Sequence, residues 1–222
     1  ALAPREEWTM KKDVSGRRQL ITGIGTTAAA VALGSAGAGA QGPATTFQPA
    51  RHQQDDWMDT LPGKHRVILD ITSPEGVPEG LRFVGNLFTG SKTGYGLEDR
   101  DLAVIVVLRH SATAYGYGEA IWSKYGRQLD SKAAEPPKAN PYDTAPRTQL
   151  SDFARRGVHY VICGSASMGI ARRLAGEKGD ADAMIKEMTA NMIPNSHIMV
   201  GVAGVVPVTH AQERGYSYLY VG

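Results

Sequence analysis

Residues 102–108 read Leu-Ala-Val-Ile-Val-Val-Leu, an unbroken apolar run that is rich in β-branched side chains. Such a run is typical of a central strand that is covered on both faces, as in a parallel sheet. Shorter apolar runs and stretches with helical spacing alternate on both sides of it. They predict strands at 67–71, 158–163, 198–202 and 216–221, and helices at 80–93, 118–125, 150–156, 168–174, 181–192 and 206–214.

This alternation of strands and helices predicts the architecture. Neighbouring parallel strands need a crossover connection, and such crossovers are right-handed. Helices then cover both faces of the sheet. We therefore expect an α/β fold with a mostly parallel sheet of about five strands. Residues 130–148 interrupt the pattern, and their content of Pro, Lys and Asp predicts an exposed loop.

The first 40 residues have the pattern of a removable export signal of the twin-arginine type. Arg17 and Arg18 precede a weakly apolar stretch at 20–33 that is rich in Gly, Ala and Thr, and the small residues at 38–40 form a cleavage-site pattern. The apolar stretch is too short and too rich in Gly to cross a bilayer, which needs about 20 apolar residues.

The predicted signal sets the bounds of the parts that follow it in the chain. Natural synthesis is expected to begin at Met10, because Met10-Lys11-Lys12 has the form of an ordinary signal start. Residues 41–60 are polar and contain Pro, which predicts a linker or arm, and residues 61–222 predict one compact domain. The mature protein is expected in the periplasm or otherwise exported through twin-arginine translocation, with no membrane attachment after the signal is removed.

The charge balance excludes one class of function. Of the 24 Lys and Arg residues five lie in the signal, as do three of the 22 acidic residues. The remainder is formally neutral, whereas nucleic-acid-binding proteins carry a basic face, so we expect no nucleic-acid partner. The single cysteine, Cys163, excludes an intramolecular disulfide, and the histidines lack paired ligand spacing, so no metal site is predicted.

Chemistry is expected at the carboxyl ends of the strands, because these ends share one edge of a parallel sheet and collect ligands there. The first predicted strand ends at Thr72 and Ser73, the second at Arg109 and His110, and the third at Cys163. The fourth is expected to end near residues 203–204. A thiol, an imidazole, a guanidinium and several hydroxyls would then lie in one region.

Cys163 is the sharpest candidate because it lies where a strand passes into a helix. The N-terminus of a helix favours an anion, and hence the nucleophilic thiolate. Gly164 would let another atom approach closely, and Ser165 follows it. The alternative is a small buried residue without chemistry, which is common for a free cysteine.

The other candidates surround this thiol in the predicted fold. His110 is expected to act as a base or as a hydrogen-bond partner of a bound sulfur anion, with a structural histidine as the alternative. Strand alternation predicts Arg109 on the opposite face unless the strand has already ended. The expected ligand contacts are Thr72, Ser73, Arg109, Gly164 and Ser165.

Several segments together resemble one family. The run 102–110, the segment Gly157-Val158-His159-Tyr160-Val161-Ile162-Cys163-Gly164 and the ending at 212–218 resemble the DsrE/DsrF-like family, and Pro62-Gly63-Lys64-His65-Arg66 resembles its exported branch. The resemblance covers roughly residues 60–222, and the segment ending in Cys163-Gly164 is its most specific part. It implies a flavodoxin-like three-layer α/β/α fold and assembly into homotrimers or hexamers.

The resemblance also implies a function. In sulfur-relay members of the family, the cysteine that matches Cys163 carries a persulfide and passes sulfane sulfur to a partner. The chain would then be an exported sulfur carrier or a weak sulfurtransferase, with a sulfur donor and an acceptor as partners. Those relays work in the cytoplasm, whereas this chain is predicted to be exported. Two alternatives remain open: a non-catalytic oligomer that binds a small ligand, and a structural assembly in which residues 41–60 wrap a neighbouring subunit.

Overall fold

The computed structural model describes residues 48–144 and 149–222. The predicted export signal at 1–40 and the first part of the predicted linker lie outside these residues. Among the described residues, no helix has both the length and the apolar character needed to cross a membrane.

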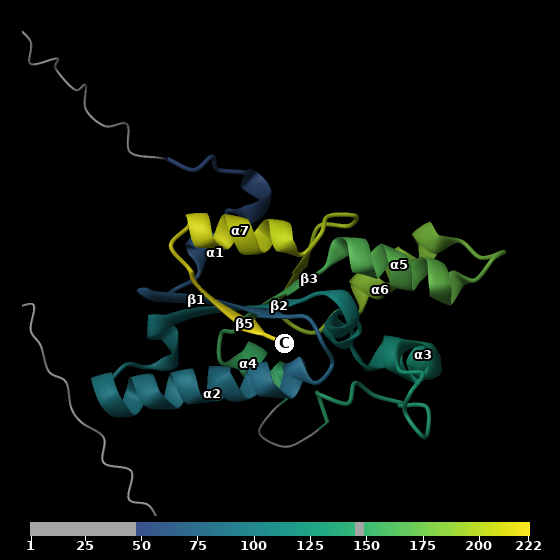
Figure 1. Ribbon diagram of the computed structural model, residues 1–222, viewed down its shortest axis with the longest axis horizontal. Helices are drawn as coiled ribbons and strands as arrows, with labels where there is room; N and C mark the ends of the chain where they lie inside the picture. Colours follow the sequence, from purple (N-terminus) through teal and green to yellow (C-terminus); the bar gives the residue numbers. More distant parts are fainter. Residues whose placement is uncertain (1–47, 145–148) are drawn as a thin grey trace, which may run out of the picture. The chain divides into compact units, whose positions relative to one another are not determined.

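Within the described residues, five parallel strands form one sheet (Figure 1). The strands are β1 His65–Ile71, β2 Leu102–Leu108, β3 His159–Ile162, β4 Ser196–Ile198 and β5 Ser217–Val221. They lie in the order β4-β3-β2-β1-β5, and every pairing is parallel. The predicted α/β fold with a parallel sheet of five strands is confirmed.

The side chains of the strands alternate between two apolar clusters, one on each face of the sheet. Val104, Val106 and Leu108 of β2 point into the larger cluster, whereas Ile105 and Val107 point into the smaller one. All seven residues of β2 are buried. The coverage on both faces that its composition predicts is therefore confirmed.

Helices complete a three-layer α/β/α arrangement, as in flavodoxin-like folds. The larger cluster is covered by α2 Gly76–Tyr95, α3 Glu119–Leu129, α4 Leu150–Arg155, α5 Gly164–Ala175 and α6 Ala181–Ala190. The smaller cluster is covered by α1 Trp57–Thr60 and α7 Val205–Glu213. Figure 1 shows α7 on one side of the sheet and α2 on the other.

The folded domain begins before β1. A 3-10 helix, η1 Gln53–Asp55, leads into α1, and Met58 of α1 is fully buried in the smaller cluster. The Tyr216 hydroxyl donates a hydrogen bond to the Met58 carbonyl at 2.6 Å. The fold therefore includes residues 53–60, which lie within the stretch that the sequence predicts as a linker or arm.

The region after β4 differs from the prediction. A strand is predicted at 198–202, but β4 ends at Ile198, and residues 199–204 form a turn that passes over the start of α5. A side chain at Gly164 would overlap the Met199 carbonyl of this turn. Gly164 is therefore needed for the approach of the chain's own backbone, where the sequence suggests the approach of a ligand.

Gly164→Ala is expected to lower the free energy of unfolding by about 2–4 kcal/mol, because the 199–204 turn must move to admit the new methyl group. Gly169→Ala, in the same helix, is the matched control. No atom lies within 4 Å of its added Cβ, so this variant should be neutral or more stable by up to ~1 kcal/mol. Urea unfolding measures both, and equal stabilities would contradict the packing of the turn on α5.

Candidate functional site

Three strand ends lie in a row at the carboxyl edge of the sheet. Arg109 donates its backbone N–H to the carbonyl of Ile71 at 3.0 Å, and Cys163 donates its own to the carbonyl of Leu108 at 3.0 Å. Thr72, Arg109 and Cys163 are thus the first residues beyond β1, β2 and β3. The prediction that these strand ends share one edge is confirmed.

Cys163 is enclosed at the junction of β3 and α5. It is the N-cap residue of α5 and is 6% exposed. Its Sγ accepts a hydrogen bond from the backbone N–H of Gly204 at 3.2 Å. A Cβ at position 204 would lie 3.2 Å from the Cβ atoms of both Arg109 and Cys163. Glycine therefore lets the 199–204 turn approach the thiol and the arginine together.

The start of α5 is occupied by the chain itself. Ser165 donates its backbone N–H to the Val202 carbonyl at 3.0 Å and its hydroxyl to the Gly201 carbonyl at 2.8 Å. These carbonyls satisfy donors that an anion would otherwise use at a helix N-terminus. The two predicted ligand contacts in this helix, Gly164 and Ser165, thus both contact the 199–204 turn.

Two consecutive hydrogen bonds link Tyr117 to the backbone of Cys163. The Tyr117 hydroxyl donates to Ser167 Oγ at 2.5 Å, and the Ser167 hydroxyl donates to the Cys163 carbonyl at 2.8 Å. Burial raises the pKa of Tyr117 to about 12, against a smaller opposing effect of the bond to Ser167. Tyr117 therefore remains a proton donor near neutral pH and anchors the first turn of α5.

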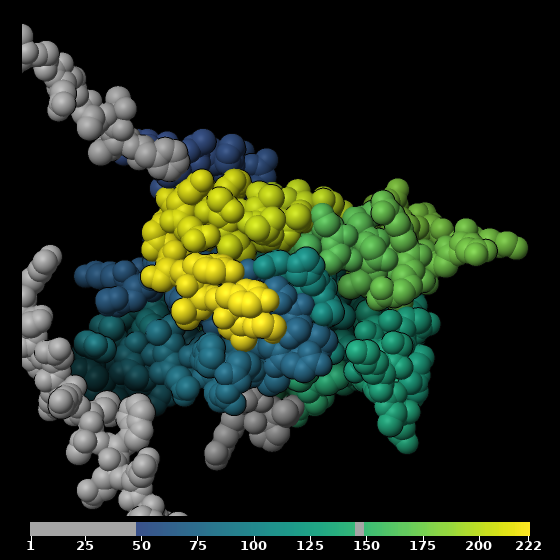
Figure 2. Space-filling view, viewed as in Figure 1, coloured from purple at the N-terminus to yellow at the C-terminus, as the bar shows by residue number. Residues whose placement is uncertain are grey.

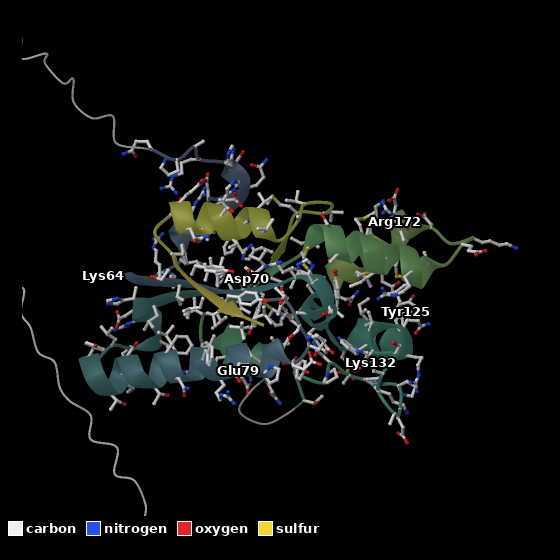
Figure 3. All side chains as sticks on the ribbon, in the orientation of Figure 1. Lys64, Asp70, Glu79, Tyr125, Lys132 and Arg172 are labelled. Atoms are coloured by element: carbon white, nitrogen blue, oxygen red, sulfur yellow. The ribbon has the colours of Figure 1, made fainter. Side chains whose placement is uncertain are left out.

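A buried ion pair lies beside the row of strand ends. Arg109 donates two hydrogen bonds to the Asp70 carboxylate, from Nε at 2.5 Å and from Nη2 at 2.8 Å. Asp70 is labelled in Figure 3. The Tyr218 hydroxyl donates to the same carboxylate at 2.9 Å. The hydrogen bond to Asp70 raises the pKa of Arg109. Asp70 is only 1% exposed, and these donors offset part of the cost of burying its charge.

Asp70 is not among the predicted site residues, although the sequence contains a signal for it. It is the one charged residue in the apolar run 67–71. A charge inside a buried strand requires a partner, and the end of the neighbouring strand supplies Arg109. Tyr218 and Gly204 carry no such signal, because their contacts join segments that are distant in the sequence.

His110 is directed toward Arg109. It begins a 3-10 helix, η3 His110–Gly116, with a φ of 53°, a left-handed conformation that few residues other than glycine adopt. Its Nε2 lies 2.5 Å from Nη1 of Arg109, and because a guanidinium only donates, Nε2 is the acceptor. β2 ends at Leu108, so Arg109 and His110 share one side. Within the described residues, no hydrogen bond joins His110 to Cys163.

The side chains of Thr72 and Ser73 contact residues 220 and 222, at the end of β5 and just beyond it. Thr72 Oγ1 lies 3.1 Å from the Tyr220 hydroxyl. The Ser73 hydroxyl donates to the Gly222 carbonyl and accepts the backbone N–H of Gly76, at 3.0 Å, where α2 begins. These two predicted ligand contacts lie on the far side of Arg109 from Cys163, because β1 follows β2 in the sheet order.

A pocket of about 330 Å³ adjoins the thiol on the side of the sheet covered by α1 and α7. Most of its lining is apolar, and Gly204, whose N–H binds the Cys163 sulfur, forms part of the wall. The lining residues are Gln54, Asp55, Trp57, Met58, Val161, Ile162, Met192, Ser196, His197, Ile198, Met199, Val202, Gly204 and Pro207. Its size and lining suit a small, largely apolar ligand.

Two histidines meet beside this pocket. His159 Nδ1 lies 2.9 Å from His197 Nε2, and the Trp57 ring stacks on His197 with centroids 3.5 Å apart. Burial lowers the pKa of both histidines, and the charge of His159 contributes to the value of about 4 for His197. The sequence does not indicate this pair, which parallel pairing of β3 and β4 brings together.

Four polar residues line the pocket: Gln54, Asp55, Ser196 and His197. Ser196 Oγ is buried and has no hydrogen-bond partner among the described residues. In the same part of the chain, no group of three or more His, Cys, Asp or Glu side chains could hold a metal ion.

Asp70→Asn is expected to lower the free energy of unfolding by about 2–4 kcal/mol, because it leaves a largely buried guanidinium without its counter-ion. Tyr218→Phe removes only one donor to the same carboxylate and should cost about 1 kcal/mol. Urea denaturation near neutral pH compares the two variants. A loss in Tyr218→Phe as large as that in Asp70→Asn would contradict this ranking.

Stability is expected to fall as the pH decreases from 6.5 toward about 4. In that window the unfolded chain takes up protons at His159 and His197 more readily than the folded chain, and above it the two histidines add no pH dependence. The contribution of His197 is on the order of 1 kcal/mol, because its ring remains partly open to water.

His197→Phe tests this pH dependence, with His65→Gln at an exposed position as the control. Urea unfolding at several pH values should show a smaller loss of stability in acid for His197→Phe than for the wild type. His65→Gln should follow the wild type. The same slope in all three proteins would refute the role of the histidine pair.

The carboxyl edge of the sheet thus combines a thiol, a paired arginine and an apolar pocket. No protein-family model, curated protein or solved structure matches the chain.

Proposed function

We propose that this chain is an exported carrier of sulfane sulfur that holds one sulfur atom as a persulfide on Cys163. The observation that supports it is the hydrogen bond that Sγ accepts from the Gly204 N–H at 3.2 Å, at the junction of β3 and α5. A backbone N–H that points at the sulfur favours a sulfur anion. The resemblance of residues 157–164 to DsrE/DsrF-like proteins points to the same chemistry.

The transfer step balances with thiosulfate as the donor. The Cys163 thiolate attacks the outer sulfur of thiosulfate, a new S–S bond forms, and sulfite leaves with the electron pair of the bond that breaks. No external oxidant is needed. An acceptor thiolate or sulfite then removes the terminal sulfur and restores the Cys163 thiolate. Such a cycle makes the chain a carrier or a weak sulfurtransferase.

An anionic donor would approach from the side of Arg109 and His110. The His110 ring is exposed and accepts a hydrogen bond from the guanidinium, which is also bound to Asp70. In the proposal, the incoming donor meets these two side chains first, and the ring N–H of His110 supplies a hydrogen bond to it.

Access to the sulfur requires the 199–204 turn to move, because Cys163 is 6% exposed. Three of the described hydrogen bonds hold this turn near the start of α5. Ser165 donates two of them, from its N–H and its hydroxyl, and Gly204 donates the third from its N–H to Sγ. The adjoining pocket of about 330 Å³ offers space for the displaced turn or for the donor.

Incubation with thiosulfate or polysulfide should add the mass of one sulfur atom to the protein, because Cys163 is its one cysteine. Intact-protein mass spectrometry measures the addition, and treatment with a reductant should reverse it. Cys163→Ser should abolish the adduct, whereas Ser165→Ala, which loosens the turn, should speed its formation. An unchanged mass, or an adduct that persists in Cys163→Ser, would rule out the carrier role.

A second candidate is a non-catalytic oligomer of the periplasm that binds a small ligand or serves as a structural protein. The burial of Cys163 beside an apolar pocket favours this candidate. Thiol labelling of the native protein separates the two. Rapid labelling near neutral pH supports the carrier, whereas labelling only after unfolding supports the binding or structural protein.

Both candidates include self-association, for which the family resemblance implies a trimer or a hexamer. The protein is proposed to act without nucleic acid or membrane, with a sulfur donor and acceptor as the further partners of the carrier.

A further inference from the structure

The strand β5 ends the sheet on one side. It pairs with β1, and within the described residues no strand pairs with its other edge. The backbone N–H and C=O groups on that edge are therefore open to another strand. Figure 2 shows this part of the chain, in yellow, on the surface of the face in view.

β5 lacks the features that usually protect an edge strand. Its sequence, Ser217-Tyr218-Leu219-Tyr220-Val221, contains no charged residue, no Pro and no Gly. Three of its residues are well exposed: Tyr218 is 41% exposed, Leu219 43% and Tyr220 58%. An uncharged, aromatic edge of this kind favours pairing with a further strand.

The opposite edge of the sheet is different. β4 has only three residues. A strand this short offers few backbone groups for pairing. The two edges therefore differ in what they can bind, and β5 is the one suited to a partner strand.

We propose that β5 pairs with β5 of a second copy of this chain, in antiparallel direction, about a two-fold axis. Two identical strands related by a two-fold axis perpendicular to the sheet must run antiparallel, and the surface that each presents is the same. The result is one continuous sheet across two subunits.

The side chains of β5 suit this arrangement. With the axis at Leu219, the two leucines lie opposite each other, and Tyr218 lies opposite Tyr220 of the partner subunit on the other face. Aromatic pairs across antiparallel strands stabilise a sheet. A charged residue at any of these positions would face either the same charge or a poorly solvated group of the second copy. β5 contains no charged residue. Two copies of β5 can therefore pair without burying a charge.

The pairing also reaches the carboxyl edge. Tyr218 binds the Asp70 carboxylate at 2.9 Å, and Tyr220 lies 3.1 Å from Thr72 Oγ1. A partner strand would fix both tyrosines and hence the ion pair of Asp70 and Arg109. The proposal does not depend on the chemistry of Cys163. It selects among the assemblies that the resemblance implies, because a hexamer with two-fold axes can hold this contact and a cyclic trimer cannot.

Sedimentation velocity of the full chain over a range of concentrations tests the proposal. The wild type should sediment as a dimer or as an even-numbered assembly. Leu219→Lys and Leu219→Glu should each raise the dissociation constant of the two-fold contact by about tenfold or more, because like charges then meet at the axis. Phe83→Lys, at a 39% exposed residue of α2, is the control and should assemble as the wild type does.

Mixing the two charged variants separates loss of the contact from misfolding. An equimolar mixture of Leu219→Lys and Leu219→Glu should recover the wild-type assembly, because opposite charges then meet. A monomeric or trimeric wild type, or Leu219 variants that assemble like the wild type, would overturn the proposal. Failure of the mixture to recover the assembly would do so as well.

A cross-linking experiment provides a second test. Leu219→Cys in a Cys163→Ser background has its one cysteine near the proposed axis. Mild oxidation should yield a disulfide-linked dimer, whereas Phe83→Cys in the same background should remain uncrosslinked. Absence of the Leu219→Cys dimer under these conditions would contradict pairing through β5.

Discussion

The burial of β2 on both faces is the constraint on which the rest of the structure depends. All seven of its residues are buried, and its backbone groups are used by β1 and β3. Such a strand has no place for polar chemistry along its length, so reactive groups collect where it ends. Arg109 is the first residue past that end. Its guanidinium turns back to neutralise Asp70, the one carboxylate that lies within the neighbouring strand.

The 199–204 turn determines how the carboxyl edge is covered near Cys163. It covers the start of α5, takes up the donors of Ser165 and binds the sulfur of Cys163 through Gly204. The same contacts enclose the sulfur. Access to the thiol therefore depends on this one short segment, and its movement distinguishes the proposed carrier from an inert thiol.

The edge also has two unlike halves. Toward β5 it is polar and built from Asp70, Arg109 and tyrosine hydroxyls, whereas toward β4 it adjoins a mostly apolar pocket on the face of the sheet covered by α1 and α7. The first half thus offers hydroxyl groups and a paired guanidinium, and the second offers space for an apolar group. Cys163 follows the strand that lies between β2 and β4, so it adjoins both halves.

The amino-acid sequence by itself determined the α/β class, the number and direction of the strands, and the common edge of Thr72, Arg109 and Cys163. These features depend on local periodicity and on a general rule for parallel sheets, both of which can be read from neighbouring residues. The tertiary structure alone decided the contacts of that edge. Gly164 serves the approach of Met199, and His159 meets His197 across 38 residues of sequence, because such contacts depend on how distant segments pack together.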